Sequence, residues 1–85
     1  MKVLIPSALH SYTGGGRAEA SGMTLAELLD DLDRRYPGIR FRMIDEQQRI
    51  RPHIRFFYAG EQLRDFNQPL DPNGELVVAQ ALSGG

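Results

Sequence analysis

Cysteine is absent from this 85-residue chain, and that absence excludes disulfide bonds, thiolate metal sites and a cysteine nucleophile. No stretch approaches the roughly 18–20 consecutive apolar residues that a membrane-spanning helix needs. The first ten residues carry one lysine and a short apolar run broken by Pro6, so they make a poor signal peptide. We therefore expect a cytoplasmic protein with no membrane segment.

A strong net charge of either sign is also missing. The formal net charge is −1, and a content of 41% hydrophobic and 25% charged residues is ordinary for a globular domain. This balance gives no reason to expect nucleic acid or an acidic membrane as a partner. A chain of this length makes one domain, and it buries too little surface to enclose a deep active-site cavity easily.

Residues for conventional catalysis are few. His10 and His53 are the only histidines, and no acid or nucleophile lies at a spacing that forms a proton relay with either. The glycines at 14–16 lack the lysine and the helix that follow in a phosphate-binding loop. We therefore expect surface or turn histidines, and a turn at the three glycines.

Two clusters of charge need an interpretation. Asp30, Asp31 and Asp33 fall on consecutive faces of a predicted helix, which indicates solvated surface and no metal site. Residues 34–55 hold seven arginines against two acidic residues, a local balance of +5. The run RFFY at 55–58 superficially resembles a nucleic-acid surface, but its two phenylalanines face opposite sides of a strand. We prefer a polar rim or a partner-docking role for these arginines.

Apolar runs near both ends of the chain predict the central strands of a sheet. Residues 2–6 (KVLIP) and the apolar centre of 75–82 (ELVVAQAL) indicate strands buried on both faces. Residues 17–21 predict a second strand paired with the first as a hairpin, and residues 53–58 predict another strand. In that strand Phe57 lies on the face opposite the other apolar side chains.

One amphipathic helix is predicted over about residues 25–36. Thr24 is a good N-cap, and Glu27 three residues later completes a capping box. Met23 and Leu28 occupy the positions of a hydrophobic staple, whose side chains pack together across the cap. A Pro-Gly pair ends the helix. The apolar stripe predicts that this helix lies on an apolar surface.

The predicted order of elements is strand, strand, helix, strand, short strand, strand. Residues 39–45 are expected to add a helical turn, and the short strand or loop falls within residues 61–67. Two apolar end strands side by side in a sheet, covered on one face by a helix, define the β-grasp arrangement, an α+β two-layer fold. We expect a mixed sheet of four to five strands. The domain is predicted to span residues 1–82, followed by a flexible tail at 83–85.

The tail carries the most specific chemical signal, the pair Gly84-Gly85. Because glycine has no Cβ, such a tail can thread a narrow channel, and its terminal carboxylate is unhindered. A carboxylate is a poor electrophile, but its attack on ATP gives an acyl-adenylate from which AMP leaves readily. A terminal glycine also has no stereocentre to racemise. The pair is a weak motif alone and gains weight from the β-grasp order before it.

These features resemble the ubiquitin-like sulfur carriers of the MoaD/ThiS family, which includes the small subunit of molybdopterin synthase and the thiamine sulfur carrier. The resemblance covers essentially the whole chain. It rests on the first apolar strand, the TGG turn, the capped TLAELL helix, the YPG that ends it, the IRPH lead into a strand and the terminal Gly84-Gly85. The tail is the specific part, since the other features mainly report the fold.

In that family an E1-like enzyme adenylates the last glycine with ATP and magnesium, and a sulfur donor converts the adenylate to a thiocarboxylate. The sulfur then passes to a sulfur-accepting synthase. The resemblance implies that Gly85 bears the sulfur, and that Leu82, Ser83 and Gly84 lie in the channel of the activating enzyme. The chain would be a protein cosubstrate and not an enzyme, with no cofactor or metal of its own. Partner docking in the family uses the tail and an apolar sheet surface, for which Phe57 is the candidate, unless that side chain is buried in the core.

The subfamily and the fate of the activated tail stay open. Gln80-Ala81 stands where many relatives have a proline-containing segment, and residues 72–75 (PNGE) replace a common DGDE turn. The opening IPSAL, followed by YTGGG, resembles carriers for cysteine or specialised-metabolite synthesis more than those for molybdopterin. The alternatives are a ubiquitin-like modifier, with Gly85 joined to lysines of other proteins, and a β-grasp interaction module that needs no terminal glycines.

Overall fold

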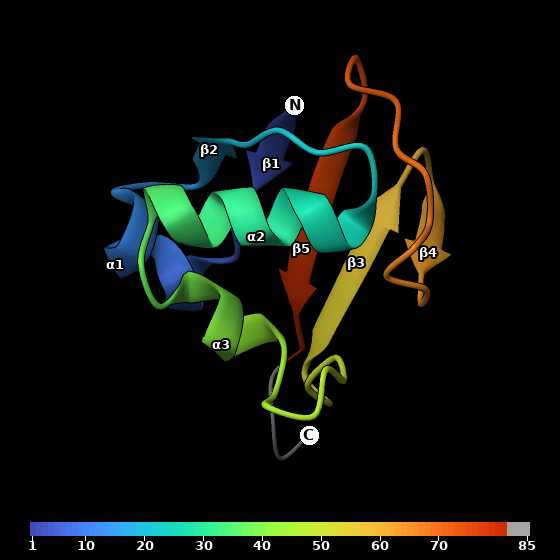
Figure 1. The fold of residues 1–85 in the computed structure, drawn as a ribbon. Helices are drawn as coiled ribbons and strands as arrows, with labels where there is room; N and C mark the ends of the chain where they lie inside the picture. Colours follow the sequence, from blue (N-terminus) through green and yellow to red (C-terminus); the bar gives the residue numbers. More distant parts are fainter. Residues whose placement is uncertain (82–85) are drawn as a thin grey trace.

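The fold was obtained as a computed structural model, which describes residues 1–81. Its elements are ordered as predicted, with two short helical turns added between the first two strands (Figure 1). They are β1 (Lys2–Leu4), η1 (Ser7–Leu9), α1 (His10–Thr13), β2 (Arg17–Glu19), α2 (Leu25–Arg35), α3 (Ile39–Met43), β3 (Ile54–Tyr58), β4 (Glu61–Leu63) and β5 (Glu75–Gln80).

The five strands form one mixed sheet in the order β2-β1-β5-β3-β4. The first and last strands lie side by side and parallel, with Val3 opposite Leu76. All other pairs of neighbouring strands are antiparallel. This confirms the predicted α+β, β-grasp arrangement with β1 and β5 at the centre of the sheet.

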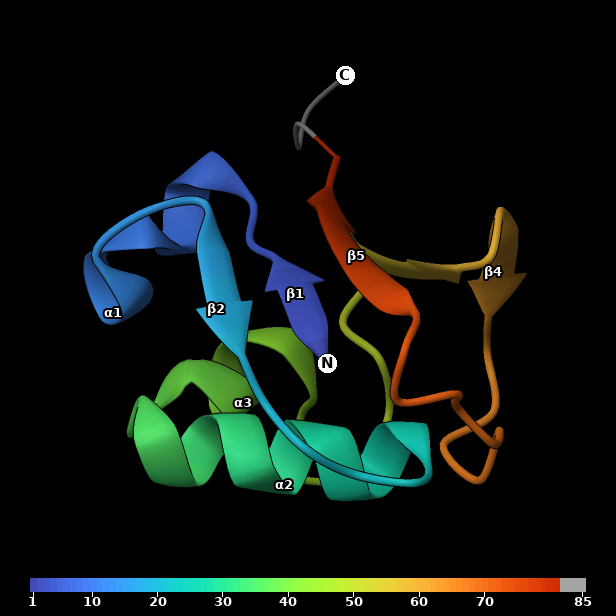
Figure 2. The same ribbon diagram turned by 90° about the horizontal axis from the view of Figure 1, so that it is seen from above.

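Helix α2 lies across one face of the sheet, and α3 lies on the same side (Figure 2). The start of α2 is fixed by Thr24, whose side-chain oxygen accepts the N–H of Glu27 at 3.2 Å. The Glu27 carboxylate in turn accepts the N–H of Met23 at 3.0 Å, so two N–H groups at the helix entry are satisfied. The predicted staple is wrong: the Met23 side chain is 77% exposed, because the chain enters the helix with this residue facing away from the sheet.

The core is a single apolar layer between α2 and the sheet. Its largest fully buried side chains come from both sides of that layer and are Phe56, Leu25, Leu28, Leu29, Leu32, Ile39, Met43, Ile44, Leu76 and Val3. Burial of β1 and β5 on both faces, as the apolar runs predicted, is wrong. In β5 the buried side chains alternate with half-exposed ones, because the described helices α2 and α3 cover only one face of the sheet.

The connection between β1 and β2 is more ordered than the predicted glycine turn. Residues 7–13 form the short turns η1 and α1, and Gly14 ends α1 with a φ of +77°, in the left-handed region that favours glycine. The chain then returns as β2, with Val3 opposite Ala18 in the predicted hairpin pairing. No helix in residues 1–81 is long and apolar enough to cross a membrane. The predicted domain boundary after residue 82 lies outside the described residues.

Candidate functional site

The sheet fixes the point from which the C-terminal segment leaves. Strand β5 pairs along its length with β3, so that Gln80 lies opposite Ile54. One residue further on, the N–H of Ala81 donates to the His53 carbonyl at 2.8 Å, which extends the pairing to the last described residue. The predicted site residues Leu82, Ser83, Gly84 and Gly85 lie outside the described part of the chain.

A half-exposed apolar row crosses the face of the sheet that α2 does not cover. Phe57 of β3 lies opposite Val77 of β5, which in turn lies opposite Leu4 of β1. Paired residues of neighbouring strands project to the same face, so the three side chains form one row across the sheet centre. All three are partly exposed, and Phe57 is outside the core cluster. We call Leu4, Phe57 and Val77 the open sheet face.

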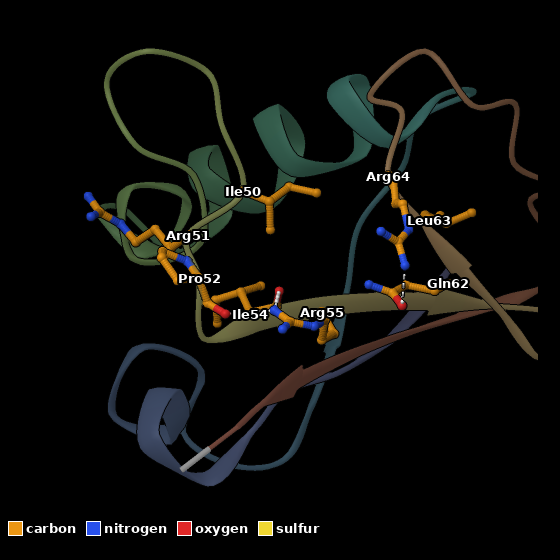
Figure 3. Close-up of a pocket in the computed structure, with 8 residues that line it drawn as sticks. All are labelled: Ile50, Arg51, Pro52, Ile54, Arg55, Gln62, Leu63 and Arg64. Carbon is orange, nitrogen blue, oxygen red and sulfur yellow. Dashed lines mark hydrogen bonds between the residues drawn. The ribbon is translucent and has the colours of Figure 1, made fainter. Parts of the chain in front are cut away.

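Two grooves adjoin the end of β5. The first, of about 510 Å³, lies between the segment before β3 and strand β4 (Figure 3). Arg55 lines it and is held by hydrogen bonds to the carbonyls of Pro52 and Ile54, at 2.7 and 2.9 Å. Neither aspartate nor glutamate lines this groove, so it offers polar contact and no acid for catalysis.

The second groove, of about 560 Å³, lies between α1, α3 and the end of β5, and it shares Arg51 with the first groove. We call it the α1/α3 groove, since those two helices supply much of its wall. It is lined by Ala8, Leu9, Ser11, Tyr12, Phe41, Arg42, Arg51, His53 and Gln80. Because Gln80 is the last residue of β5, this groove opens beside the exit of the C-terminal segment.

The acidic residues of α2 serve the fold and do not converge on a metal. Asp31, expected on a solvated surface, is only 8% exposed, because its carboxylate accepts the N–H of Ser21 at 2.8 Å and ion-pairs with Arg34 and Arg35. Asp33 instead accepts the N–H groups at the start of α3, from Gly38 and Arg40. Within residues 1–81 no group of three histidine, aspartate or glutamate side chains is placed to hold a metal ion.

Two carboxyl groups titrate below their ordinary range. The Ser21 N–H, more than any other contact, lowers the pKa of Asp31; burial opposes this effect, and the neighbouring arginines reinforce it. The pKa of Asp45 is lowered chiefly by the N–H of Arg49, again against a cost of burial. Both groups stabilise local turns, and neither faces the two grooves.

The histidines form no proton relay within the described residues. Nε2 of His10 lies 2.9 Å from the Ile5 carbonyl oxygen, which ties α1 to the end of β1. His53 is exposed and lines the α1/α3 groove. The prediction of a surface or turn histidine holds for His53, whereas His10 is half-buried at the start of α1. The described surface therefore offers the open sheet face and the two grooves as contacts around the exit of the C-terminal segment.

The sequence matches no protein-family model and no curated protein. Solved structures are more informative. A chain of the Amycolatopsis orientalis BexX/CysO complex is 28% identical, with a TM-score of 0.89 over 99% of this chain and 98% of that one. CysO of Mycobacterium tuberculosis is 24% identical, with a TM-score of 0.88 over 95% and 98%. SAMP1 of Haloferax volcanii is 23% identical, with a TM-score of 0.79 over 100% and 98%.

These neighbours, CysO and small archaeal modifier protein 1, share the ubiquitin-like β-grasp fold of the MoaD/ThiS type. The resemblance expected from the sequence is confirmed, and with it the fold class. The chain spans nearly the full length of each of these structures, so they are whole-domain likenesses.

Sequence reasoning missed the α1/α3 groove. Its lining comes from four separated segments, at residues 8–12, 41–42, 51–53 and 80, which only the fold brings together. One signal was present in the sequence. Phe41 lies among the arginines of residues 34–55, away from the apolar stripe of α2, and an aromatic residue in such a setting is a candidate for an exposed contact.

Proposed function

We propose that this protein is a sulfur carrier whose terminal glycine, Gly85, is adenylated by an E1-like enzyme and then converted to a thiocarboxylate. The observation that supports the proposal most is the whole-chain likeness, at 28% identity, to a chain of the BexX/CysO complex, together with the pair Gly84-Gly85. On this proposal the chain is a protein cosubstrate, and the catalysts are its partners.

The chemistry requires only the terminal carboxylate from this chain. A carboxylate oxygen of Gly85 attacks the α-phosphorus of ATP, bound with magnesium in the partner, and pyrophosphate leaves. The sulfur of a sulfide-level donor then attacks the acyl carbon, AMP leaves, and a thiocarboxylate remains. In the Amycolatopsis orientalis complex the partner of CysO is BexX. By analogy, the sulfur acceptor here would be a biosynthetic enzyme of cysteine or specialised-metabolite type.

The residues around the tail would position it. Leu82, Ser83 and Gly84 would occupy the narrow channel of the activating enzyme, where the absence of a side chain on glycine allows close approach. The open sheet face would contact the same partner beside the channel, since Phe57 and Val77 form an exposed apolar surface on the strands next to the exit. A sulfur-accepting synthase would use the same tail in a later encounter.

The test is the intact mass of the protein purified from its own host, with its C-terminal peptide fragmented. We expect a fraction of molecules heavier by the exchange of one oxygen for sulfur, with the added mass on Gly85. A matched control carries one extra alanine after Gly85, which keeps both glycines but moves the carboxylate, and should stay unmodified.

Two other results would decide against the carrier. If Gly85 is recovered in isopeptide linkage to lysine, the protein is a modifier, as the name small archaeal modifier protein indicates for the SAMP1 neighbours. If only free carboxylate appears after incubation with ATP, magnesium, sulfide and host lysate, Gly85 forms neither a thiocarboxylate nor an isopeptide bond. The protein is then a β-grasp interaction module.

A further inference from the structure

The α1/α3 groove has no role in the function proposed above, yet it opens beside the exit of the C-terminal segment. Gln80 lines the groove, and the next residue, Ala81, donates its N–H to the carbonyl of His53, another lining residue. A partner that receives the tail therefore passes close to this groove. Its position makes it an extension of any interface built around the tail.

Two aromatic rings of the groove are held in place by arginines. The guanidinium carbon of Arg51 lies 4.6 Å from the centre of the Phe41 ring, and Nε of Arg51 donates to the Phe41 carbonyl at 2.7 Å. Arg42 is placed similarly against Tyr12, with its Nε donating to the phenol oxygen at 2.7 Å. Phe41 is nevertheless 55% exposed. The groove is thus preorganised, with an exposed ring and two fixed guanidinium groups.

Within the described residues, ion pairs with aspartates neutralise some of the arginines of residues 34–55 and leave the others free to bind a partner. Four of its seven arginines form ion pairs with Asp30, Asp31 or Asp45: Arg34, Arg35, Arg40 and Arg49. The other three, Arg42, Arg51 and Arg55, form no ion pair within residues 1–81. Two of these three line the α1/α3 groove, where no aspartate or glutamate accompanies them. The excess charge is therefore concentrated around the exit of the tail.

We propose that the α1/α3 groove binds an acidic segment of the enzyme that receives the C-terminal tail, with carboxylates on Arg42 and Arg51 and an apolar side chain against Phe41. Only the identity of that enzyme rests on the proposed function. Arginine binds carboxylates through parallel N–H···O bonds, and in both arginines Nε already fixes the plane of the guanidinium group. Such a contact speeds encounter and sets the orientation in which the tail meets its channel.

The groove fits an acidic peptide better than a nucleic acid. Single-stranded nucleic acids bind by stacking bases on open aromatic faces along a continuous basic track. Here one face of the single exposed ring, Phe41, is already covered by Arg51, and the basic track is limited to Arg42, Arg51 and His53. An exposed ring edge beside two separate guanidinium groups suits alternating apolar and acidic side chains.

The test is an NMR titration of the full-length ¹⁵N-labelled protein with the peptide acetyl-EEFEE-amide. We expect saturable shifts of amides at residues 8–13, 40–43 and 51–53, and little effect from acetyl-QQFQQ-amide. The double variant Arg42→Gln/Arg51→Gln should weaken binding about tenfold, since the loss of two surface ion pairs together costs about 1.4 kcal/mol. The matched control Arg34→Gln/Arg49→Gln removes the same charge from two exposed arginines that line neither groove, and should change binding less than about twofold.

Three outcomes would overturn the proposal: shifts spread over the whole surface, equal shifts with the glutamine peptide, or tighter binding of a single-stranded RNA oligonucleotide at the same amides. The spectra of each variant also report whether it is folded. Arg42→Lys/Arg51→Lys provides a second check, because it keeps the charge but loses the planar fork, and should bind with intermediate affinity.

Failure of this proposal is distinguishable from failure of the carrier function. A chain lacking Gly84-Gly85 should bind the peptide normally while forming no thiocarboxylate. In the lysate assay the Arg42→Gln/Arg51→Gln variant should form thiocarboxylate about tenfold more slowly than the Arg34→Gln/Arg49→Gln control. Equal rates in the two variants would remove the link between the groove and the enzyme that receives the tail.

Discussion

Asp31 shows how a single carboxylate joins two elements of this small domain. It is on α2, but the contact that most lowers its pKa is the N–H of Ser21, ten residues earlier, in the segment that leads from β2 to the helix. Arg34 and Arg35 on the next turn of α2 neutralise its charge. The carboxylate therefore stabilises the path of the chain over the helix, and it does so only while ionised.

This gives a prediction for stability against pH. A carboxyl whose pKa is lower in the folded than in the unfolded state stabilises the fold above its unfolded pKa, about 3.9. That stabilisation disappears as the pH falls through the lower folded value. The urea midpoint should therefore fall between about pH 5 and pH 2. In Asp31→Asn the midpoint should be lower at pH 7 and should fall less on acidification, with the remaining slope due in part to Asp45.

The neighbouring Asp30 provides a matched control. Its side chain is 70% exposed and forms a single ion pair with Arg40, which contributes little at a surface. Asp30→Asn should therefore keep the pH slope of the unaltered protein. Equal slopes in Asp30→Asn and Asp31→Asn would show that the Ser21 contact is not the source of the pH dependence.

At the scale of elements, the chain passes close to the start of α2 on its way from β2 to the helix. A Cβ on Gly22 would overlap the backbone nitrogen of Leu28, closer than real Cβ atoms come to any non-bonded atom. The backbone atoms it meets belong to the first turn of the helix, which cannot yield as a flexible side chain would. Only glycine fits, because any side chain here would push the crossing segment away from the helix.

Gly22→Ala should consequently lower the free energy of unfolding by about 1–3 kcal/mol, the usual cost of overpacking. Gly15→Ala is the matched control, because a Cβ at Gly15 meets nothing within 4 Å and its backbone is not left-handed. That change should stay within about 0.5 kcal/mol. Urea unfolding of both variants measures the difference, and similar losses in the two would contradict the close approach at Gly22.

For the molecule as a whole, the local signals in the sequence were sufficient for the fold. The cap at Thr24 and the stripe of leucines depend on neighbours within a few residues, so α2 could be predicted nearly to its ends. The central position of β1 and β5 followed from their apolar runs. What could not be predicted depends on distant partners. The open second face of β5 depends on where the helices lie, and the burial of Asp31 depends on the loop at Ser21.

The candidate site divides in the same way. The terminal glycines could be singled out from the sequence alone, because their chemistry does not depend on the fold. Phe57 could be assigned to the face opposite Phe56 from strand periodicity, but its exposure could not, since that requires knowing which face the helix covers. The α1/α3 groove joins four separate segments, and no local pattern in the sequence marks it.

The two adjacent phenylalanines of β3 give the last prediction, which separates stability from partner docking. Phe56 is fully buried in the core, whereas Phe57 is half-exposed on the open sheet face. Phe56→Ala should lower the free energy of unfolding by about 3–5 kcal/mol. Phe57→Ala should cost no more than about 1–2 kcal/mol, because less apolar surface is removed from contact.

The rate of thiocarboxylate formation should be affected in the opposite order, more by the change at Phe57 than by the change at Phe56. At a temperature where both variants are folded, Phe57→Ala should form thiocarboxylate more slowly in the lysate assay, whereas Phe56→Ala should retain its rate, because its side chain never meets a partner. Urea unfolding and the intact mass measured over time give the two quantities. Were Phe57→Ala as destabilising as Phe56→Ala, its role would be structural. Were neither its stability nor its rate altered, the open sheet face would not be the docking surface, and the interface would have to be built on the tail and the arginines around its exit.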